Sequence, residues 1–157
     1  MRALDAALAG RDARWIGGSD VLAADDAMIA GHRSFSNDAL WPLFHESTVA
    51  PIFEPAAFAD YRAVNERFAR AIVDASAIET DAPIWIHDFQ LLLIPSLVRQ
   101  RGVDRPIGLF QHIPFPSATA FARLPWRVEL LEGMLGADLL GFQTVSYTHL
   151  RAHETRE

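Results

Sequence analysis

The sequence contains no cysteine. Disulfide bonds and thiolate metal sites are therefore excluded, and this composition is typical of the reducing cytoplasm. His149 and His153 lie four residues apart and could share a helix face. Two histidines without a third ligand are a weak indication of a metal site, and a solvated tail explains them as well. We predict neither a metal ion nor another cofactor.

Basic residues are fewer than acidic ones. The formal net charge is -6, and no stripe of lysine and arginine is present. Nucleic acid is therefore not an expected partner, because binding to phosphates along a strand requires such a stripe. Arg99 and Arg101 form a local exception that could contact a small anionic substrate.

Long apolar runs are also absent. No segment approaches the roughly 20 apolar residues that span a membrane, so no membrane partner is expected. The first residues, Met1–Asp5, lack the apolar region and cleavage site of a signal peptide. A cytoplasmic location is the resulting expectation. The chain has 157 residues, of which 50% are apolar, which is enough for the packed core of about one domain.

Three short apolar runs alternate with helical patterns in the second half of the chain. The runs cover residues 83–88, 106–112 and 137–142, and the helical patterns cover about residues 91–101 and 126–135. Strands that are buried on both faces read as continuous apolar runs, so this alternation predicts parallel β-α-β units. We predict an α/β fold with an open parallel sheet and helices on both faces.

The first half of the chain reads as mostly helical. A helix is expected over residues 1–10, a short strand over residues 14–18, and a weak helix or a loop over residues 19–31. From Pro55 onward, which suits a first helical position, apolar residues recur at spacings of three and four. They are Phe58, Tyr61, Val64, Phe68 and Ile72, and their spacing predicts an amphipathic helix.

Polar residues follow the first two predicted strands. Asp88 ends the first strand and His112 ends the second. The carboxyl ends of parallel strands meet at one edge of a sheet, where ligands bind, so the two side chains are expected in one cleft. A simpler interpretation is that both residues cap or brace the following segment. Pro114 and Pro116 stiffen the loop after His112, although they could equally act only as strand terminators.

Trp41 and His32 are further candidates for contact with a substrate. A cap at Ser36 or Asn37 would begin a short helix that holds Trp41. The Trp41 ring could stack against a sugar, but its spacing alone favours a place in the core. His32 lies on a polar stretch beside Arg33, which could meet a phosphate or simply be exposed.

Long motifs connect these residues to a known family. The chain resembles trehalose-6-phosphate synthases and the related glucosylglycerol-phosphate synthases from about Trp15 to Thr144. The matching segments are FSNDALWPLFH at 35–45, WIHDFQLLLIP at 85–95, IGLFQHIPFPS at 107–117, LPWR at 124–127 and LEGMLGADLLGFQT at 131–144.

The resemblance implies a two-domain GT-B fold, of which this chain would be a truncated, Rossmann-like N-terminal half. It implies transfer of glucose from a nucleotide-glucose, usually UDP-glucose, to glucose 6-phosphate with retention of configuration. No metal is implied, because basic residues of the second domain stabilise the leaving diphosphate. By motif position, Trp41 and Asp88 would contact the acceptor, and His112 would lie by the donor glucose, so Asp88 and His112 are the expected catalytic residues. His32 stands where the family usually has a tyrosine that reaches the acceptor phosphate.

The resemblance also suggests domain boundaries and alternatives. Residues 1–144 would be a partial acceptor-side domain whose family-typical first strand would precede Met1, and residues 145–157 do not resemble the family. Without a donor-binding domain the chain is expected to be inactive alone, and a homo-oligomer of the full-length protein stays open. Two departures from the family pattern are His32 and the presence of Gly18 in place of an aromatic residue. Because of them, glycerol 3-phosphate is an alternative acceptor. A non-catalytic sugar-phosphate-binding or regulatory domain is the remaining alternative.

Overall fold

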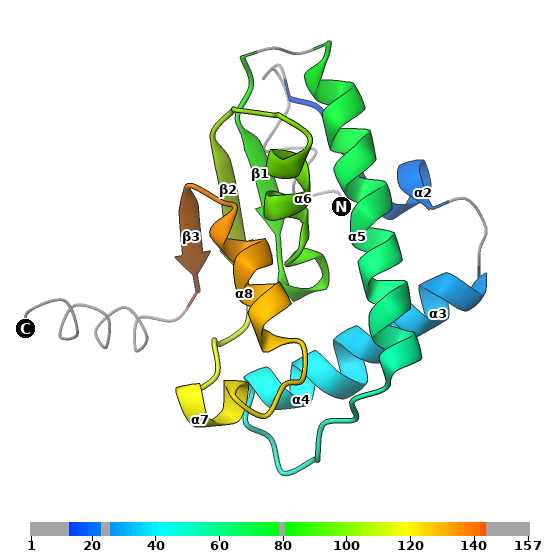
Figure 1. Cartoon of the computed structure of the whole chain (residues 1–157), viewed down its shortest axis with the longest axis vertical. Helices are drawn as coiled ribbons and strands as arrows, with labels where there is room; N and C mark the ends of the chain where they lie inside the picture. The colour runs from blue at the N-terminus through cyan, green and yellow to red at the C-terminus, as the bar shows by residue number, and fades with distance from the viewer. Residues whose placement is uncertain (1–12, 23–25, 79–80, 144–157) are drawn as a thin grey trace, which may run out of the picture.

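The computed structural model describes residues 13–22, 26–78 and 81–143 (Figure 1). The helix predicted over residues 1–10 and the pair of histidines in the tail lie outside these ranges. The predicted boundary at residue 144 lies at their end and stays a prediction.

A parallel sheet of three strands lies at the centre of the described chain. Strands β1 (Ile84–His87), β2 (Ile107–Gln111) and β3 (Leu139–Phe142) pair in the order β1-β2-β3. In the register of the sheet, Ile86 pairs with Leu109, and Leu109 pairs with Leu140. The open parallel sheet predicted from the three apolar runs is confirmed.

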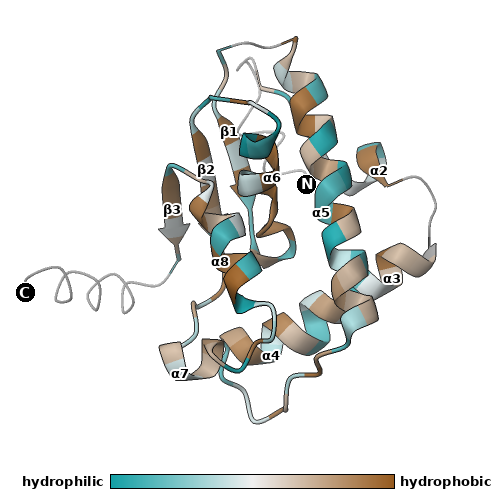
Figure 2. Ribbon diagram, in the orientation of Figure 1, coloured by the Kyte–Doolittle hydropathy of each residue, from teal (hydrophilic) through white to brown (hydrophobic). Residues whose placement is uncertain are grey.

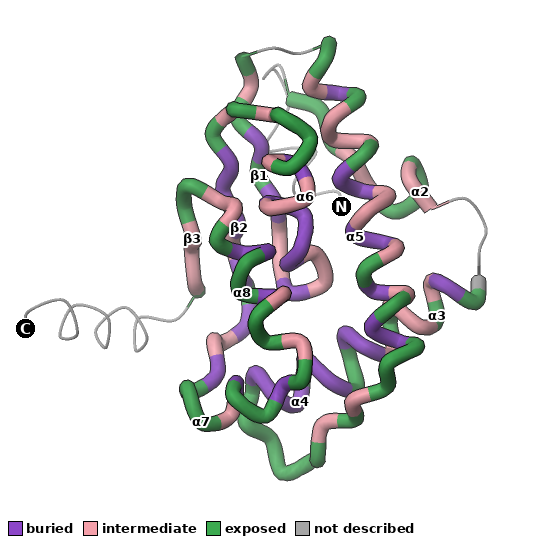
Figure 3. The backbone as a smooth tube through the Cα atoms, viewed as in Figure 1, coloured by how far each residue is buried: buried purple, intermediate pink, exposed green. Residues whose placement is uncertain are grey.

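Helices α6 (Ile94–Gln100) and α8 (Arg127–Leu135) lie over the sheet in Figure 1. The alternate strand residues Ile86 and Leu109 are buried in the same core as the apolar side of these helices. On the opposite face, Trp85 is 51% exposed. In the described ranges α6 and α8 therefore cover one face of the sheet, and strand β2 in its middle is buried along most of its length (Figure 3).

Arg99 stabilises the amino-terminal edge of the sheet by hydrogen bonds. Its guanidinium group donates to the carbonyl oxygens of Val103 and Arg105 at 2.9 and 2.8 Å and to Asp138 Oδ2 at 2.6 Å. The Ile107 N–H, 2.7 Å from the same Oδ2, is the main cause that lowers the pKa of Asp138. Arg99 is therefore a structural residue at the edge opposite the strands' carboxyl ends.

Arg101 is also engaged by the protein itself. Its guanidinium group pairs with Glu66 and donates to the Leu97 carbonyl oxygen at 2.7 Å. These contacts give both arginines a structural role, and contact of either one with a small anionic substrate stays a prediction.

Helix α5 (Pro55–Ser76) is the longest helix of the described chain and runs beside the sheet (Figure 1). Its alternating polar and apolar bands are visible in Figure 2, and Tyr61 and Val64 are fully buried. The helix predicted from Pro55 is confirmed. None of the described helices has the length and apolarity that crossing a bilayer demands.

A 3-10 turn, η2 (Phe89–Leu91), separates β1 from α6. The helix expected to begin near Leu91 therefore begins at Ile94 instead. Gly102 has a φ of 81° just after this helix, a conformation that glycine adopts without steric cost. Glycine at this position ends the helix as predicted.

The strand predicted over residues 14–18 is wrong. Residues 13–17 have no regular structure, and helix α2 (Gly18–Val21) follows them. The Gly17 N–H donates to Asp20 Oδ2 at 2.8 Å, which satisfies a free donor at the start of that helical turn. Local capping by Asp20 thus replaces strand pairing.

The cap predicted at Ser36 or Asn37 is also wrong, because the chain is already helical there. Helix α3 (Asp26–Ser34) passes into a π-helix, η1 (Phe35–Leu40), and then into α4 (Trp41–Phe44). The Ser36 hydroxyl donates back to the His32 carbonyl oxygen at 2.8 Å. A serine that bonds to the preceding turn is compatible with a helix interior.

Candidate functional site

The carboxyl edge of the sheet brings Asp88 and His112 together. Asp88 Oδ1 accepts hydrogen bonds from the backbone N–H groups of Phe89 at 3.0 Å and His112 at 3.2 Å. The Asp88 N–H donates to the Phe110 carbonyl oxygen at 2.7 Å. Asp88 therefore has the structural role of the simpler interpretation, because its carboxylate caps the η2 turn and braces the end of β2. The cleft expected at this edge stays a prediction.

Asp88 has an unusual backbone conformation. Its φ is 75° and its ψ is 169°, a region that is almost restricted to glycine. Holding another residue there costs on the order of 1–3 kcal/mol, and such strain is concentrated at functional sites. The carboxylate that joins β1 to β2 is therefore held in place against a local conformational cost.

Tyr61 and Asn65 of α5 hold the turn that follows Asp88. The buried Tyr61 hydroxyl donates to the Phe89 carbonyl oxygen at 2.7 Å and accepts from the Leu92 N–H at 3.0 Å. Burial raises the pKa of Tyr61, so the phenol stays protonated and can donate.

Asn65 supplies the second half of this attachment. Its Nδ2 donates to the Gln90 carbonyl oxygen at 3.0 Å, and its Oδ1 accepts from the Leu93 N–H at 3.1 Å. The sequence analysis missed both roles. An asparagine four residues after Tyr61, on the buried side of a helix, is the signal that could have identified a polar attachment.

Trp41 lies beside the same turn and is 46% exposed. Its ring centroid is 5.8 Å from that of Phe89 and 4.0 Å from that of His45. His45 Nδ1 also lies 2.9 Å from the Trp41 carbonyl oxygen. The core position that spacing favoured for Trp41 is therefore wrong, and an open aromatic surface is available for stacking.

His32 contacts the turn from a second direction. Its Nε2 lies 3.1 Å from the Gln90 carbonyl oxygen, so this nitrogen must be the donor. Its ring stacks on Tyr61 with centroids 5.4 Å apart. Burial is the main cause that lowers the pKa of His32, which leaves a neutral ring whose Nδ1 is an acceptor.

An open pocket of about 260 Å³ is lined by His32 and residues around it. Arg33, Asn37 and Gln90 also line it, together with Ile29 and Ser36. A guanidinium and an amide in one pocket can donate hydrogen bonds to an anionic group. The sequence left two alternatives for Arg33, simple exposure or contact with a phosphate. Arg33 is exposed and also lines this pocket.

The π-helix explains why His32 and Trp41 both reach the turn. Nine residues make about 2.5 turns of a regular α-helix, which would direct the two side chains to opposite sides. A π-helix has wider turns and rotates less per residue. The segment Phe35–Leu40 therefore changes the direction of Trp41 relative to His32, and both contact residues 89–90.

His87, the last residue of β1, is a further member of the site. It is half-buried, and its Nδ1 lies 3.0 Å from Nε2 of the exposed His112. The two rings lie edge to edge, with centroids 5.3 Å apart and an angle of 14° between their planes. Burial lowers the pKa of His87, His112 lowers it further, and Asp88 opposes the change.

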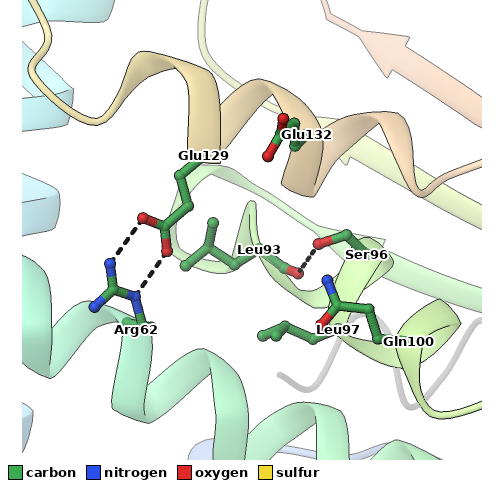
Figure 4. A pocket seen from close by; sticks show the side chains of 7 residues that line it. All are labelled: Arg62, Leu93, Ser96, Leu97, Gln100, Glu129 and Glu132. Carbon is green, nitrogen blue, oxygen red and sulfur yellow. Dashed lines mark hydrogen bonds and ion pairs between the residues drawn. The ribbon is translucent and has the colours of Figure 1, made fainter.

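A separate pocket of about 190 Å³ lies between α5, α6 and α8 (Figure 4). Arg62 and Glu129, which line it, form a bidentate ion pair with both N–O distances 2.7 Å. No residue of the carboxyl edge lines it. Within residues 13–22, 26–78 and 81–143, no group of three or more histidine or acidic side chains is arranged to hold a metal ion.

Comparison with known proteins gives consistent matches. The profile of glycosyltransferase family 20 matches residues 18–150. The chain belongs to glycosyltransferase family 20. It is 46% identical over 121 residues to trehalose-6-phosphate synthase of Mycobacterium avium (strain 104), a match that covers 77% of this chain and 24% of that protein.

Solved structures of family members have the same fold. An alpha,alpha-trehalose-phosphate synthase (UDP-forming) from Burkholderia vietnamiensis matches with a TM-score of 0.72 and 35% identity, over 82% of this chain and 28% of that one. The corresponding protein from Burkholderia xenovorans, solved in complex with glucose-6-phosphate, also has a TM-score of 0.72 and 35% identity, over 78% of this chain and 27% of that one. The chain thus spans about a quarter of the length of the family members it matches.

The turn after Asp88 is attached through the Tyr61 hydroxyl, and we expect loss of this hydroxyl to lower the stability of the chain. Tyr61→Phe leaves the Phe89 carbonyl oxygen and the Leu92 N–H without their buried partner, which costs about 1–3 kcal/mol. Urea denaturation of the chain measures the change in unfolding free energy. Ser34→Ala is the control, because it removes an exposed bond to Asp38 and should change stability by at most about 0.5 kcal/mol. Equal effects of the two changes would contradict the proposed attachment.

The backbone strain at Asp88 predicts an inverted order of two substitutions. Asp88→Ala and Asp88→Gly both lose the carboxylate, but only glycine relaxes at a φ of 75°. Asp88→Gly should therefore be about 1–3 kcal/mol more stable than Asp88→Ala. At the exposed helical Asp74, the same pair should show the usual order, with alanine favoured by about 1 kcal/mol. Denaturant titration of the four variants compares them, and alanine favoured at both positions would disprove the strain.

Proposed function

We propose that this chain is the acceptor-side part of a longer enzyme that transfers glucose from UDP-glucose to glucose 6-phosphate. The product would be trehalose 6-phosphate, formed with retention of configuration. The observation that carries the proposal is the hydrogen bond of Asp88 Oδ1 with the His112 N–H, which puts a carboxylate and an imidazole at one edge of the sheet. Ligands of open parallel sheets bind at this edge.

The acceptor would bind on the side of Trp41 and Asp88. The half-exposed Trp41 ring offers a surface on which the apolar face of a sugar can stack. The Asp88 carboxylate has acceptor capacity beyond its two backbone bonds, since two carboxylate oxygens present about four lone-pair sites. It can therefore accept hydrogen bonds from sugar hydroxyl groups.

His112 would act on the donor side. Its side chain is exposed at the end of β2, and an imidazole N–H can donate to a hydroxyl of the transferred glucose. A donor held in place before the reaction stabilises charge that develops at the transition state without reorganising. Closure of a second domain over this edge would exclude water and favour transfer over hydrolysis.

Glycerol 3-phosphate is a second candidate acceptor, and one observation at His32 favours it. The Gln90 carbonyl oxygen takes the N–H of a neutral His32 ring, so Nδ1 can accept from a hydroxyl but cannot donate to a phosphate. The tyrosine contact to the phosphate of glucose 6-phosphate, typical of the family at this position, is then absent. Arg33 and Asn37, which line the same pocket, would hold the phosphate of either acceptor.

We expect the 157-residue chain alone to form no trehalose phosphate. The purified chain, incubated with UDP-glucose and glucose 6-phosphate, should release no UDP above the rate without acceptor. The reason is that the residues that bind the glucosyl donor would lie mainly in a second domain. Mass spectrometry of the sugar phosphates and a coupled UDP assay measure this. A UDP-glucose-dependent product from this chain would contradict the division into two domains.

Asp88→Asn in the full-length protein should weaken the acceptor interaction. The amide keeps the geometry of the two backbone bonds but loses the charge, so we expect kcat/KM for glucose 6-phosphate to fall about 10- to 100-fold, as for loss of a charged hydrogen bond. Asp104→Asn is a matched control, because Asp104 is fully exposed and makes only a 3.9 Å ion pair with Arg99.

The same assay separates the candidates. Product analysis with glucose 6-phosphate and with glycerol 3-phosphate identifies the acceptor, and NMR of the product gives its anomeric configuration. An unchanged kcat/KM in Asp88→Asn, or no turnover of either acceptor by the full-length protein, would reject the proposed function.

A further inference from the structure

The hydrogen-bonded histidines at the carboxyl edge form a pair that the proposed transfer reaction does not explain. His112 has the proposed role toward the donor, but His87 has none, although its Nδ1 lies 3.0 Å from Nε2 of His112. Each ring comes from the end of a different strand. Strand pairing brings them together, because His87 is in register with Phe110, two residues before His112.

The hydrogen bond between the rings links their tautomers. A neutral imidazole carries one N–H and one acceptor nitrogen, so one hydrogen lies between His87 Nδ1 and His112 Nε2. If His87 supplies it, the remaining hydrogen of His112 must be on Nδ1. If His112 supplies it, His112 Nδ1 is left as an acceptor. The partner at Nε2 therefore decides whether Nδ1 of His112 donates or accepts.

The proposed role of His112 requires His87 to be the donor. Nε2 of His112 faces His87, so only Nδ1 of His112 is left to donate to a sugar hydroxyl, and a hydrogen on Nδ1 of a neutral ring leaves Nε2 as the acceptor. Trp15 and Trp85 lie beside the His87 ring, with centroids 6.4 and 6.2 Å away, and Phe110 lies edge-on to His112 at 4.7 Å. The titratable groups that act on His87 are His112 and the Asp88 carboxylate, and burial outweighs Asp88 and lowers the pKa of His87.

We propose that His87 is a positioning residue whose Nδ1–H donates to Nε2 of His112, so that His112 presents its Nδ1–H to the sugar of the glucosyl donor. The inference rests on the proposed function, because that function requires a hydrogen-bond donor at His112. His87 does not touch the substrate in this arrangement. It acts through His112 by selecting one tautomer and by restraining the ring through the hydrogen bond.

The tautomer of His112 can be observed directly by NMR. In the full-length protein with ¹⁵N-labelled histidine, the chemical shifts of the ring nitrogens distinguish N–H from unprotonated nitrogen, and His112→Gln assigns the signals. At pH 7.5, without substrate, we expect His112 Nδ1 to carry the hydrogen. A His112 that carries its hydrogen on Nε2 would overturn the proposal.

Substitutions of His87 test the direction of the bond. His87→Asp offers only an acceptor near the position of Nδ1, so it should move the His112 hydrogen to Nε2 and lower kcat/KM about 10- to 100-fold. His87→Asn offers an amide N–H at that position and should retain the Nδ1–H tautomer and most of the activity. His45→Asp adds the same charge at an exposed residue that contacts Trp41 and should leave the His112 tautomer unchanged.

The outcomes distinguish this inference from the proposed function. Circular dichroism and thermal unfolding of each variant establish that it is folded before its tautomer is compared. If His112 has the same tautomer in the wild type, His87→Asp and His87→Asn, the inference fails even when the enzyme is active. If the tautomer follows the substitutions but no glucosyl transfer occurs with the wild type, the proposed function fails and the control of His112 by His87 stands.

Discussion

The attachment of helix α5 to the turn after β1 is the interaction on which the rest of the site depends. Tyr61 and Asn65 bond to backbone groups of residues 89–93 and thereby leave few buried polar groups of this irregular turn unsatisfied. The fixed turn also supports Asp88 in a backbone conformation that is unfavourable for any side chain. It also provides the Gln90 carbonyl oxygen and the Phe89 ring against which His32 and Trp41 lie. The buried attachment of a helix to a turn therefore positions three side chains, those of Asp88, His32 and Trp41.

Much of the fold follows from patterns that a single sequence displays. The three strands are apolar runs whose central residues, such as Ile86 and Leu109, are buried, and such runs are visible without knowing their neighbours. Helix α5 follows from the spacing of Phe58, Tyr61 and Val64. The meeting of Asp88 and His112 was predictable for the same reason, since parallel strands have their carboxyl ends at one edge.

The remaining features depend on contacts between distant segments or on small differences in free energy between local conformations. The exposure of Trp41 could not be read from its apolar neighbours, because the π-helix sets its direction. The helix at Gly18 depends on one hydrogen bond from Gly17 to Asp20. The contact of His87 with His112 depends on strand register, in which a shift by one residue would turn either ring to the other face. The family motifs pointed to candidate residues, but they did not contain these geometries.

The π-helical segment between His32 and Trp41 makes chain length as important as residue identity. A π-helix closes its hydrogen bonds over one more residue than an α-helix, so deleting a single residue from Phe35–Leu40 would allow the segment to tighten into regular α-helix. Trp41 would then follow His32 by eight residues, which is about 2.2 turns of regular α-helix, so the two side chains would still lie within about a quarter of a turn of each other. Tightening the segment without losing a residue would instead put them about 2.5 turns apart, on opposite sides. The length of this segment and its π-helical hydrogen bonds therefore depend on each other.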